Sequence, residues 1–537
     1  MKKYLTITLF ILVCCTSVFS QTRTVTVNPS ESFQTIDNFT ASDAWSGEFV
    51  GRYWSEAEKS RIARWLFSHE TDAAGNPCGI GLSMWRVNLG GGTLEQENPD
   101  ILPFQRRAES YLTADGSGYD WNKCPGQRWF VSKAAELGCN NFLLFSNTPP
   151  VQFTLNGKGW APSTDRANLR PECYGKFAGY LADVAAHYQE NGLKVSYISP
   201  INEPNVRWNS PRQEGSSWRI DEMYHVFSEL DKALDARKGL EDVKITVGES
   251  GDLKYFYSTS NYLQQGFGGT DLAPAFLVQR FWDPASHYYL GNFRHIPRLI
   301  VGHDYWSETS NRQMLEVRHK VKEVCDKYNV GFQQSEWCLL PSSLIKIKDG
   351  MTHEDYVSGD IDVALLMSRL IHSDMTVAGA TAWGYWKSME VKGDHSLIAL
   401  WPDDGDLHKG GRVTANKLLW ALGNYSFFIR PGYVRIACDG ADDLGGLAVS
   451  AFVSPESDRL VLVGVNSGFQ DVDISLKLPS SVRRKISDVK VYRTDARTDL
   501  ALVASLPHLP QSMCIPQRSV TTVVIDLSMR PASSKRQ

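Results

Sequence analysis

The sequence lacks several features that would place it in a common class of protein. No Cys-x-x-Cys pair occurs among its ten cysteines, so a zinc site is not expected. No Gly-x-Ser-x-Gly motif occurs, which argues against a hydrolase of the Ser-His-Asp type. Lysine and arginine form no cluster and the formal net charge is −4, so nucleic acid is not an expected partner.

Long hydrophobic runs are also missing. The apolar stretch over 4–13 follows two lysines and is followed by a small-residue cleavage pattern at Ser20, so we expect 1–20 to be a secretory signal peptide. The stretch is shorter than the roughly 20 residues that a membrane-spanning helix needs, so no membrane span is expected. The expected location is secreted or periplasmic, with a lipid anchor at Cys14-Cys15 on the cell surface as the alternative. The eight remaining cysteines are compatible with disulfides or with buried thiols.

What the sequence does contain is a regular alternation of strand-like and helix-like segments. A chain of 537 residues has room for two domains. Short β-rich runs recur about every 40–60 residues with helical patterns between them, which is typical of βα units and a parallel sheet. Eight such units close a barrel, although an open doubly wound sheet shows the same alternation. The eight runs are 34–41, 81–88, 141–147, 195–202, 244–248, 298–303, 330–335 and 376–383.

The pattern changes after a helical stretch over 415–422. Alternating segments separated by turn residues follow, which is typical of an antiparallel sandwich. The mature N-terminus alternates in the same way and is expected to add a strand to that sandwich. We therefore predict an α/β fold with a (β/α)8 TIM barrel over 34–424 and a C-terminal antiparallel β-sandwich side domain over 425–537, joined by an N-terminal strand within 21–33.

Two glutamates close apolar runs of the predicted barrel. The fourth run ends in Asn202-Glu203-Pro204, and the seventh is followed directly by Glu336. Active sites of such barrels lie at the C-terminal ends of the strands, so both carboxyl groups are expected at one mouth. A retaining glycosidase needs one carboxylic acid and one carboxylate about 5–5.5 Å apart. We predict Glu203 and Glu336 as this catalytic pair.

Other charged residues near strand ends are alternatives or partners of this pair. Glu249, which ends the fifth run, is the main competitor for the nucleophile and is otherwise expected to support the rim. Asp37 and Asp43 are weaker competitors. Arg86 lies between apolar residues, and a buried arginine needs a carboxylate, so Glu336 is its expected partner.

These motifs resemble those of clan A retaining glycosidases and, within them, glycoside hydrolase family 30. The resemblance implies that Glu203 is the general acid/base, that Asn202 holds the sugar 2-hydroxyl and that Glu336 is the nucleophile. It also implies a double-displacement reaction without metal or organic cofactor. The motifs that carry the resemblance, besides the two glutamates, are Gln34-Thr35-Ile36-Asp37-Asn38-Phe39-Thr40-Ala41-Ser42, Trp85-Arg86-Val87-Asn88, His303-Asp304-Tyr305 and Trp383-Gly384-Tyr385-Trp386.

The sequence departs from the family pattern in two places. Asn38 and Thr40 stand where the family has glycine, and the third run ends without the usual tryptophan motif. The binding contact at that strand is expected from Asn147 or Trp160 instead. Strand alternation places only one of Trp383 and Trp386 at the sugar site. The candidate substrate-binding residues are Arg86, Asn88, Asn147, Asn202, His303, Tyr305, Trp45, Trp160, Trp208, Trp337, Trp383 and Trp386.

The expected function is therefore that of a secreted retaining β-glycoside hydrolase whose partner is a β-linked polysaccharide or oligosaccharide. The resemblance points to the endo-β-1,6-galactanase branch, which acts on arabinogalactan side chains. The alternatives are a β-1,6-glucanase, a xylanase, a glucosylceramidase-like enzyme, or a carbohydrate-binding protein that has lost turnover.

Overall fold

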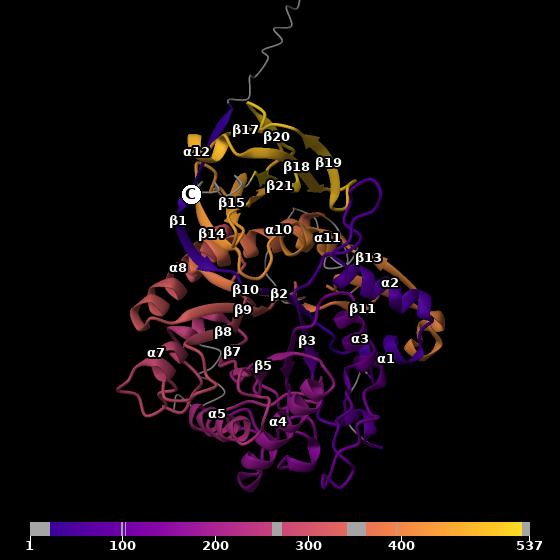
Figure 1. The fold of residues 1–537 in the computed structure, drawn as a ribbon. Helices are drawn as coiled ribbons and strands as arrows, with labels where there is room; N and C mark the ends of the chain where they lie inside the picture. The colour runs from indigo at the N-terminus through magenta and orange to yellow at the C-terminus, as the bar shows by residue number, and fades with distance from the viewer. Residues whose placement is uncertain are drawn as a thin grey trace, which may run out of the picture.

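The computed structural model describes residues 22–97, 100–101, 104–259, 271–340, 361–393 and 395–528 (Figure 1). The predicted signal peptide over 1–20 lies outside the described residues. Within them, no helix is both long enough and apolar enough to cross a bilayer. None of the eight cysteines in this part of the chain forms a disulfide bond.

Eight parallel strand positions close a barrel. The sheet runs in the order β6-β5-β4-β3-β2-β10-β9-β8-β7. Its two ends, β6 (Lys244–Ile245) and β7 (Gly248–Ser250), are halves of one interrupted strand, and the residues between them bond to strands on both sides: Thr246 N to Ile198 O, and Val301 N to Val247 O. The predicted closed barrel is thereby confirmed. The other strands are β2 (Asn38–Ser42), β3 (Met84–Asn88), β4 (Phe142–Phe145), β5 (Val195–Ser199), β8 (Leu299–His303), β9 (Gly331–Glu336) and β10 (Ala380–Lys387).

Amphipathic helices surround the barrel. At the start of α2 (Glu56–Phe67) the Ser55 side chain accepts a hydrogen bond from Glu58 N at 3.3 Å and caps the helix. A small sheet of β11 (Met389–Val391), β12 (Ile398–Pro402) and β13 (Gly411–Ala415) follows the last barrel strand. The helices are α1 (Ser46–Tyr53), α2 (Glu56–Phe67), α3 (Pro125–Glu136), α4 (Tyr174–Glu190), α5 (Ile220–Asp235), α7 (Leu277–Trp282), α8 (Asn311–Tyr328), α10 (Ile361–Ser373) and α11 (Lys417–Ser426).

Two predicted strand starts are wrong by a few residues. Residues 34–35 belong to β1 (Arg23–Thr35), a strand of the side domain. Residues 376–378 belong to a π-helical turn, η6 (Asp374–Ala378), that ends at Gly379 with φ of +77°. Glycine adopts this left-handed conformation without strain, so the turn ends there and β10 begins one residue later.

The side domain is a mostly antiparallel sheet of nine strands in the order β19-β18-β21-β16-β15-β14-β1-β17-β20 (Figure 1). The N-terminal β1 pairs with β14 and β17, as predicted. Asn466 Nδ2 on β16 donates to Ile515 O on β20, five places away in this order, so the sheet curls over itself in two layers. The further strands are β14 (Val434–Asp439), β15 (Leu447–Val453), β16 (Arg459–Asn466), β17 (Val472–Lys477), β18 (Ile486–Thr494), β19 (Ala501–Leu506), β20 (Met513–Ile515) and β21 (Ser519–Leu527).

Candidate active site

A cavity of about 390 Å³ opens at the C-terminal ends of the barrel strands. Glu203, from the loop after β5, and Glu336, from the end of β9, both line it. Oxygen atoms of the two carboxyl groups lie within 4.8 Å of each other. The sequence thus predicted correctly that these two distant residues share one mouth.

Glu336 is held by two side chains, one from β3 and one from the segment that follows β8. Arg86 Nη1 on β3 donates to Glu336 Oε2 at 2.6 Å, and the Tyr305 hydroxyl donates to Oε1 at 2.9 Å. Arg86 is fully buried, with its guanidinium 3.8 Å from the centre of the Phe145 ring. Arg86 therefore contacts Glu336 as predicted, and Tyr305, predicted as a substrate-binding residue, contacts it as well.

Burial and the neighbouring positive charges shift the pKa of Glu336 in opposite directions. Removal from water raises the pKa of this carboxyl, and the nearby Glu203 adds to the effect, whereas the charges of His303 and Arg86 oppose it. The pKa of Glu336 stays above its ordinary value. Its ionised form is oriented by two donors, which leaves a lone pair available toward the cavity.

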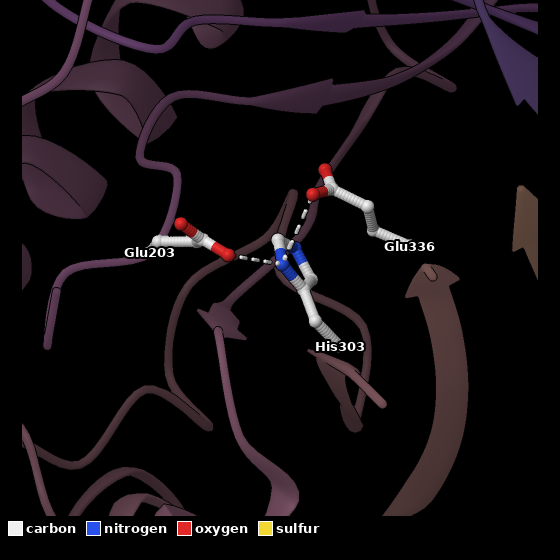
Figure 2. Close-up of side chains that lie close together, drawn as sticks. All are labelled: Glu203, His303 and Glu336. Atoms are coloured by element: carbon white, nitrogen blue, oxygen red, sulfur yellow. Dashed lines mark hydrogen bonds and ion pairs between the residues drawn. The ribbon is translucent and has the colours of Figure 1, made fainter. Parts of the chain in front are cut away.

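Glu203 is placed by an unusual backbone conformation. Its φ is +45°, and its N–H donates to the carbonyl of Glu249 at 2.9 Å. A residue other than glycine pays for this conformation in local strain, which in proteins accumulates at functional sites. The result is that the Glu203 carboxyl points to His303, with Oε1 3.1 Å from Nδ1 (Figure 2).

Three asparagines form a chain beside the glutamates. Asn202 Oδ1 accepts from Arg86 Nη2 at 3.2 Å, and its Nδ2 donates to Asn147 Oδ1 at 3.0 Å. Asn147 in turn donates to Asn88 Oδ1 at 3.3 Å. Of the three, only Asn202 lines the cavity. Asn147 and Asn88, both predicted as substrate contacts, instead lie behind Asn202 and hold its amide in place.

The six candidate tryptophans separate into two groups. Trp45, Trp208 and Trp386 line the cavity. Trp160, predicted as a binding contact at the third strand, is not among the lining residues.

Trp337 and Trp383 are fully buried outside the cavity, so their predicted position at the sugar site is wrong. Trp383 Nε1 donates to Asp374 Oδ2 at 2.9 Å, in the layer between barrel and helices. Successive side chains of a strand point to opposite faces, so the residue after Glu336 turns away from the mouth. Of Trp383 and Trp386, only Trp386 lines the cavity.

The competing carboxylates lie elsewhere. Glu249 is 1% exposed, beneath the cavity rather than at its rim, and its Oε2 is 3.0 Å from His303 Nε2. Asp37 bonds to the Tyr197 hydroxyl and does not line the cavity. Asp43 is buried and accepts from Asn88 N. None of the three reaches the position where a nucleophile would be needed.

Several lining residues were not singled out from the sequence. Arg106 and Arg212 come from the long loops after β3 and β5. The paths of these loops cannot be predicted from sequence periodicity. Trp306 directly follows Tyr305. Lys387 is the last residue of β10 and is 5% exposed. Only Lys387 carried a usable signal, because it is a polar residue that closes an apolar strand.

One group of side chains has the spacing of a metal site. Donor atoms of Glu203, His303 and Glu336 lie within 4.8 Å of one another. However, Arg86 already occupies one Glu336 oxygen at 2.6 Å, and both ring nitrogens of His303 face carboxylates. A cation would displace these contacts and meet the charge of Arg86, so the group suits protons better than a metal.

Comparison with known proteins gives matches over most of the chain. The model of O-glycosyl hydrolase family 30 matches residues 22–396. An endo-beta-1,6-galactanase of Hypocrea rufa is 27% identical over 266 residues, which are 46% of this chain and 52% of that protein. The chain thus matches about half the length of this curated relative.

Solved structures match over nearly the whole chain. A conserved exported protein from Bacteroides fragilis is 32% identical, with a TM-score of 0.85 over 94% of this chain and 100% of that one. A GH30 endoxylanase from Clostridium papyrosolvens is 18% identical, with a TM-score of 0.60 over 94% of this chain and 100% of that one, and shares the fold.

Proposed function

Because this chain belongs to O-glycosyl hydrolase family 30, we propose that it is a retaining β-glycoside hydrolase that cleaves β-1,6-linked galactan side chains of arabinogalactan. The observation that carries the reaction is the pair Glu203 and Glu336, with carboxyl oxygens within 4.8 Å. Retaining enzymes hold their carboxyl groups about 5–5.5 Å apart, whereas inverting enzymes need about 6.5–9.5 Å to admit a water molecule.

In the first step, the Glu336 carboxylate attacks the anomeric carbon while Glu203 gives its proton to the glycosidic oxygen. The bond to the leaving sugar breaks and a covalent glycosyl-enzyme forms. Arg86 and Tyr305 hold the attacking carboxylate at its angle. The buried position of both donors means that this orientation is set before substrate binds.

In the second step, Glu203 acts as the base. It takes a proton from water, the hydroxide attacks the anomeric carbon, and Glu336 leaves as a carboxylate. Asn202 also lines the cavity, and we expect its amide to bond the 2-hydroxyl of the sugar, as the resemblance to the family implies. The anomeric configuration is inverted twice and therefore retained.

The choice of galactan rests on the similarity to an endo-beta-1,6-galactanase and on the lining of the cavity. Trp45, Trp208 and Trp386 line the cavity, and we expect their rings to stack against sugar rings. A cavity with three tryptophans suits successive residues of a chain better than one small glycoside. We also propose that the chain is exported by the signal peptide over 1–20, which N-terminal sequencing of the mature protein tests.

Digestion of a substrate panel tests the proposed activity. De-arabinosylated arabinogalactan, β-1,6-glucan and xylan are each incubated with the wild type and with Glu336→Gln, and the products are identified by mass spectrometry and linkage analysis. We expect β-1,6-galactobiose and longer galacto-oligosaccharides from the first polymer, and no products from the variant. Gluco- or xylo-oligosaccharides in their place would contradict the galactan assignment.

A further inference from the structure

His303 faces three carboxyl groups although it is fully buried. Its Nδ1 lies 3.1 Å from Glu203 Oε1 and 3.5 Å from Glu336 Oε1 (Figure 2). Its Nε2 lies 3.0 Å from Glu249 Oε2. The ring therefore joins both catalytic glutamates to a third glutamate that has no part in the proposed reaction.

Glu249 is surrounded by donors. Its Oε1 accepts from the hydroxyls of Ser199 at 2.9 Å and Thr246 at 3.2 Å, and its Oε2 accepts from Ser335 at 2.8 Å. Arg86 Nη2 is 3.7 Å from the same carboxyl. Burial alone would raise the pKa of Glu249, but the bond to His303 and the charge of Arg86 lower it to about 2. A carboxylate held in this form only accepts, so His303 Nε2 must carry a proton.

The contacts of Nδ1, the other ring nitrogen of His303, indicate how many protons the ring carries. If His303 were neutral, Nδ1 would present a lone pair to the oxygens of Glu203 and Glu336. With a second proton, Nδ1 donates to Glu203 and its charge balances the neighbouring carboxylates. Burial would lower the pKa of His303, yet the charge of Glu336 and the bonds to Glu203 and Glu249 raise it to about 10.

We propose that Glu249 and His303 are positioning residues for the acid/base: Glu249 keeps His303 doubly protonated, and the charged ring stabilises the Glu203 carboxylate that remains after proton transfer to the leaving group. The proposal rests on the assignment of Glu203 as acid/base, but not on which sugar is cleaved. His303 keeps both protons throughout: the proton lost by Glu203 goes to the glycosidic oxygen and is later replaced from water.

The direction of the pH effect follows from the charges that face the ring, namely those of Glu203, Glu249, Glu336 and, beyond them, Arg86. Loss of the His303 charge makes both catalytic glutamates hold their protons more tightly. In the pH profile of kcat/KM, Glu336 must be ionised, which sets the acid limb, and Glu203 must be protonated, which sets the alkaline limb. Both limbs should then move to higher pH, by about 1–2 units.

Glu249 gives a test of sign. If Glu249→Gln lets His303 lose its second proton, the positive charge of His303 disappears. That charge is nearer to the catalytic glutamates than the negative charge of Glu249, so both limbs move to higher pH. If His303 stays charged without Glu249, only a negative charge has been removed, and both limbs move downward. The two outcomes cannot be confused with a simple loss of packing, which lowers activity without moving the limbs.

The experiment measures pH profiles of kcat/KM for the wild type, His303→Gln, Glu249→Gln and the double variant on an aryl glycoside with a poor leaving group. We expect upward shifts in both single variants, and a profile of the double variant that matches Glu249→Gln, because His303 has already lost its charge when Glu249 is replaced. A downward shift in Glu249→Gln, or additive shifts, would overturn the proposal. His295→Gln is the matched control: His295 is also buried and lies 3.2 Å from the Asp235 carboxylate, but it is not among the cavity-lining residues.

Nitrogen NMR of histidine-labelled protein reads the ring directly and needs only the folded wild type, with His303→Gln to assign the signal. We expect both nitrogens of His303 to be protonated from pH 5 to 8. An unprotonated Nδ1 in that range overturns the proposal. Failure of the wild type to cleave galactan would overturn the substrate assignment alone, since these readouts use an aryl glycoside or no substrate.

Discussion

Arg86 connects residues from several strands of the barrel. It bonds Glu336 and Asn202, stands 3.7 Å from Glu249, and lies over the ring of Phe145. A buried cation is costly unless carboxylates surround it, and here it has two. The same pairing that stabilises Arg86 in the core also holds the attacking carboxylate at its angle.

A small anion should restore the activity that is lost when the nucleophile is removed. We expect Glu336→Gly to abolish turnover, because the covalent intermediate can no longer form. Added azide should restore activity on an activated aryl glycoside and yield a glycosyl azide of inverted anomeric configuration, which NMR identifies. Full activity of this variant without azide would contradict the role of Glu336.

The loss of activity caused by removing the general acid should depend on the leaving group. We expect Glu203→Ala to slow glycosides with poor leaving groups by about 10²–10⁴-fold and activated aryl glycosides much less, since only the former need a proton. Rates on a series of aryl glycosides with rising leaving-group pKa measure this. Equal losses across the series would show that Glu203 does not protonate the leaving group.

At the scale of elements, the loop after β3 is fixed by a buried acid from the loop after β5. Glu214 accepts from the Thr93 hydroxyl at 2.6 Å and from the backbone N–H of Gly91 at 3.0 Å. Burial raises the pKa of Glu214 to about 7, although the bonds to Thr93 and Gly91 oppose this. The loops that carry Arg106 and Arg212 to the cavity are thus tied together by this carboxyl group.

The stability of this clamp should fall as the pH rises. The folded chain holds the Glu214 proton more tightly than the unfolded chain, so the free energy of unfolding declines from about pH 4.5 to 7, by up to roughly 3 kcal/mol from this group. Glu214→Gln removes that contribution. Denaturation at pH 5 and 8 should show a smaller decline in the variant than in the wild type. Equal declines would contradict the raised pKa.

Sequence patterns located the barrel strands well because each is a short buried run with a polar residue at its end. They placed Trp337 and Trp383 wrongly because the face a side chain takes depends on where alternation begins, and Gly379 starts β10 later than the apolar run suggests. They also missed Arg106 and Arg212, because loop paths follow from tertiary contacts such as that of Glu214 rather than from periodicity.

At the scale of the whole molecule, barrel and side domain share a buried polar contact. Helices α10 and α11 lie between them (Figure 1). Asn424 on α11 donates to the Thr522 hydroxyl at 2.9 Å and accepts from the Thr494 hydroxyl at 2.6 Å, and all three are fully buried. We therefore expect the two domains to unfold together.

Asn424→Ala removes the side-chain hydrogen bonds to the buried Thr494 and Thr522 hydroxyls and should lower the free energy of unfolding by roughly 1–3 kcal/mol. Chemical denaturation followed by fluorescence measures this. The exposed Asn140→Ala serves as control, with a change within about 1 kcal/mol expected. Two separate transitions in the wild type would contradict the coupling of the domains.

The central claim is that the enzyme works through a covalent intermediate on Glu336. A 2-deoxy-2-fluoro glycoside with a good leaving group forms that intermediate quickly but releases it slowly, so the labelled residue can be found by peptide mass spectrometry. The account predicts a single glycosyl label on Glu336, and none in Glu336→Gln. A label on Glu249, or turnover with inversion of configuration and no label, would contradict it.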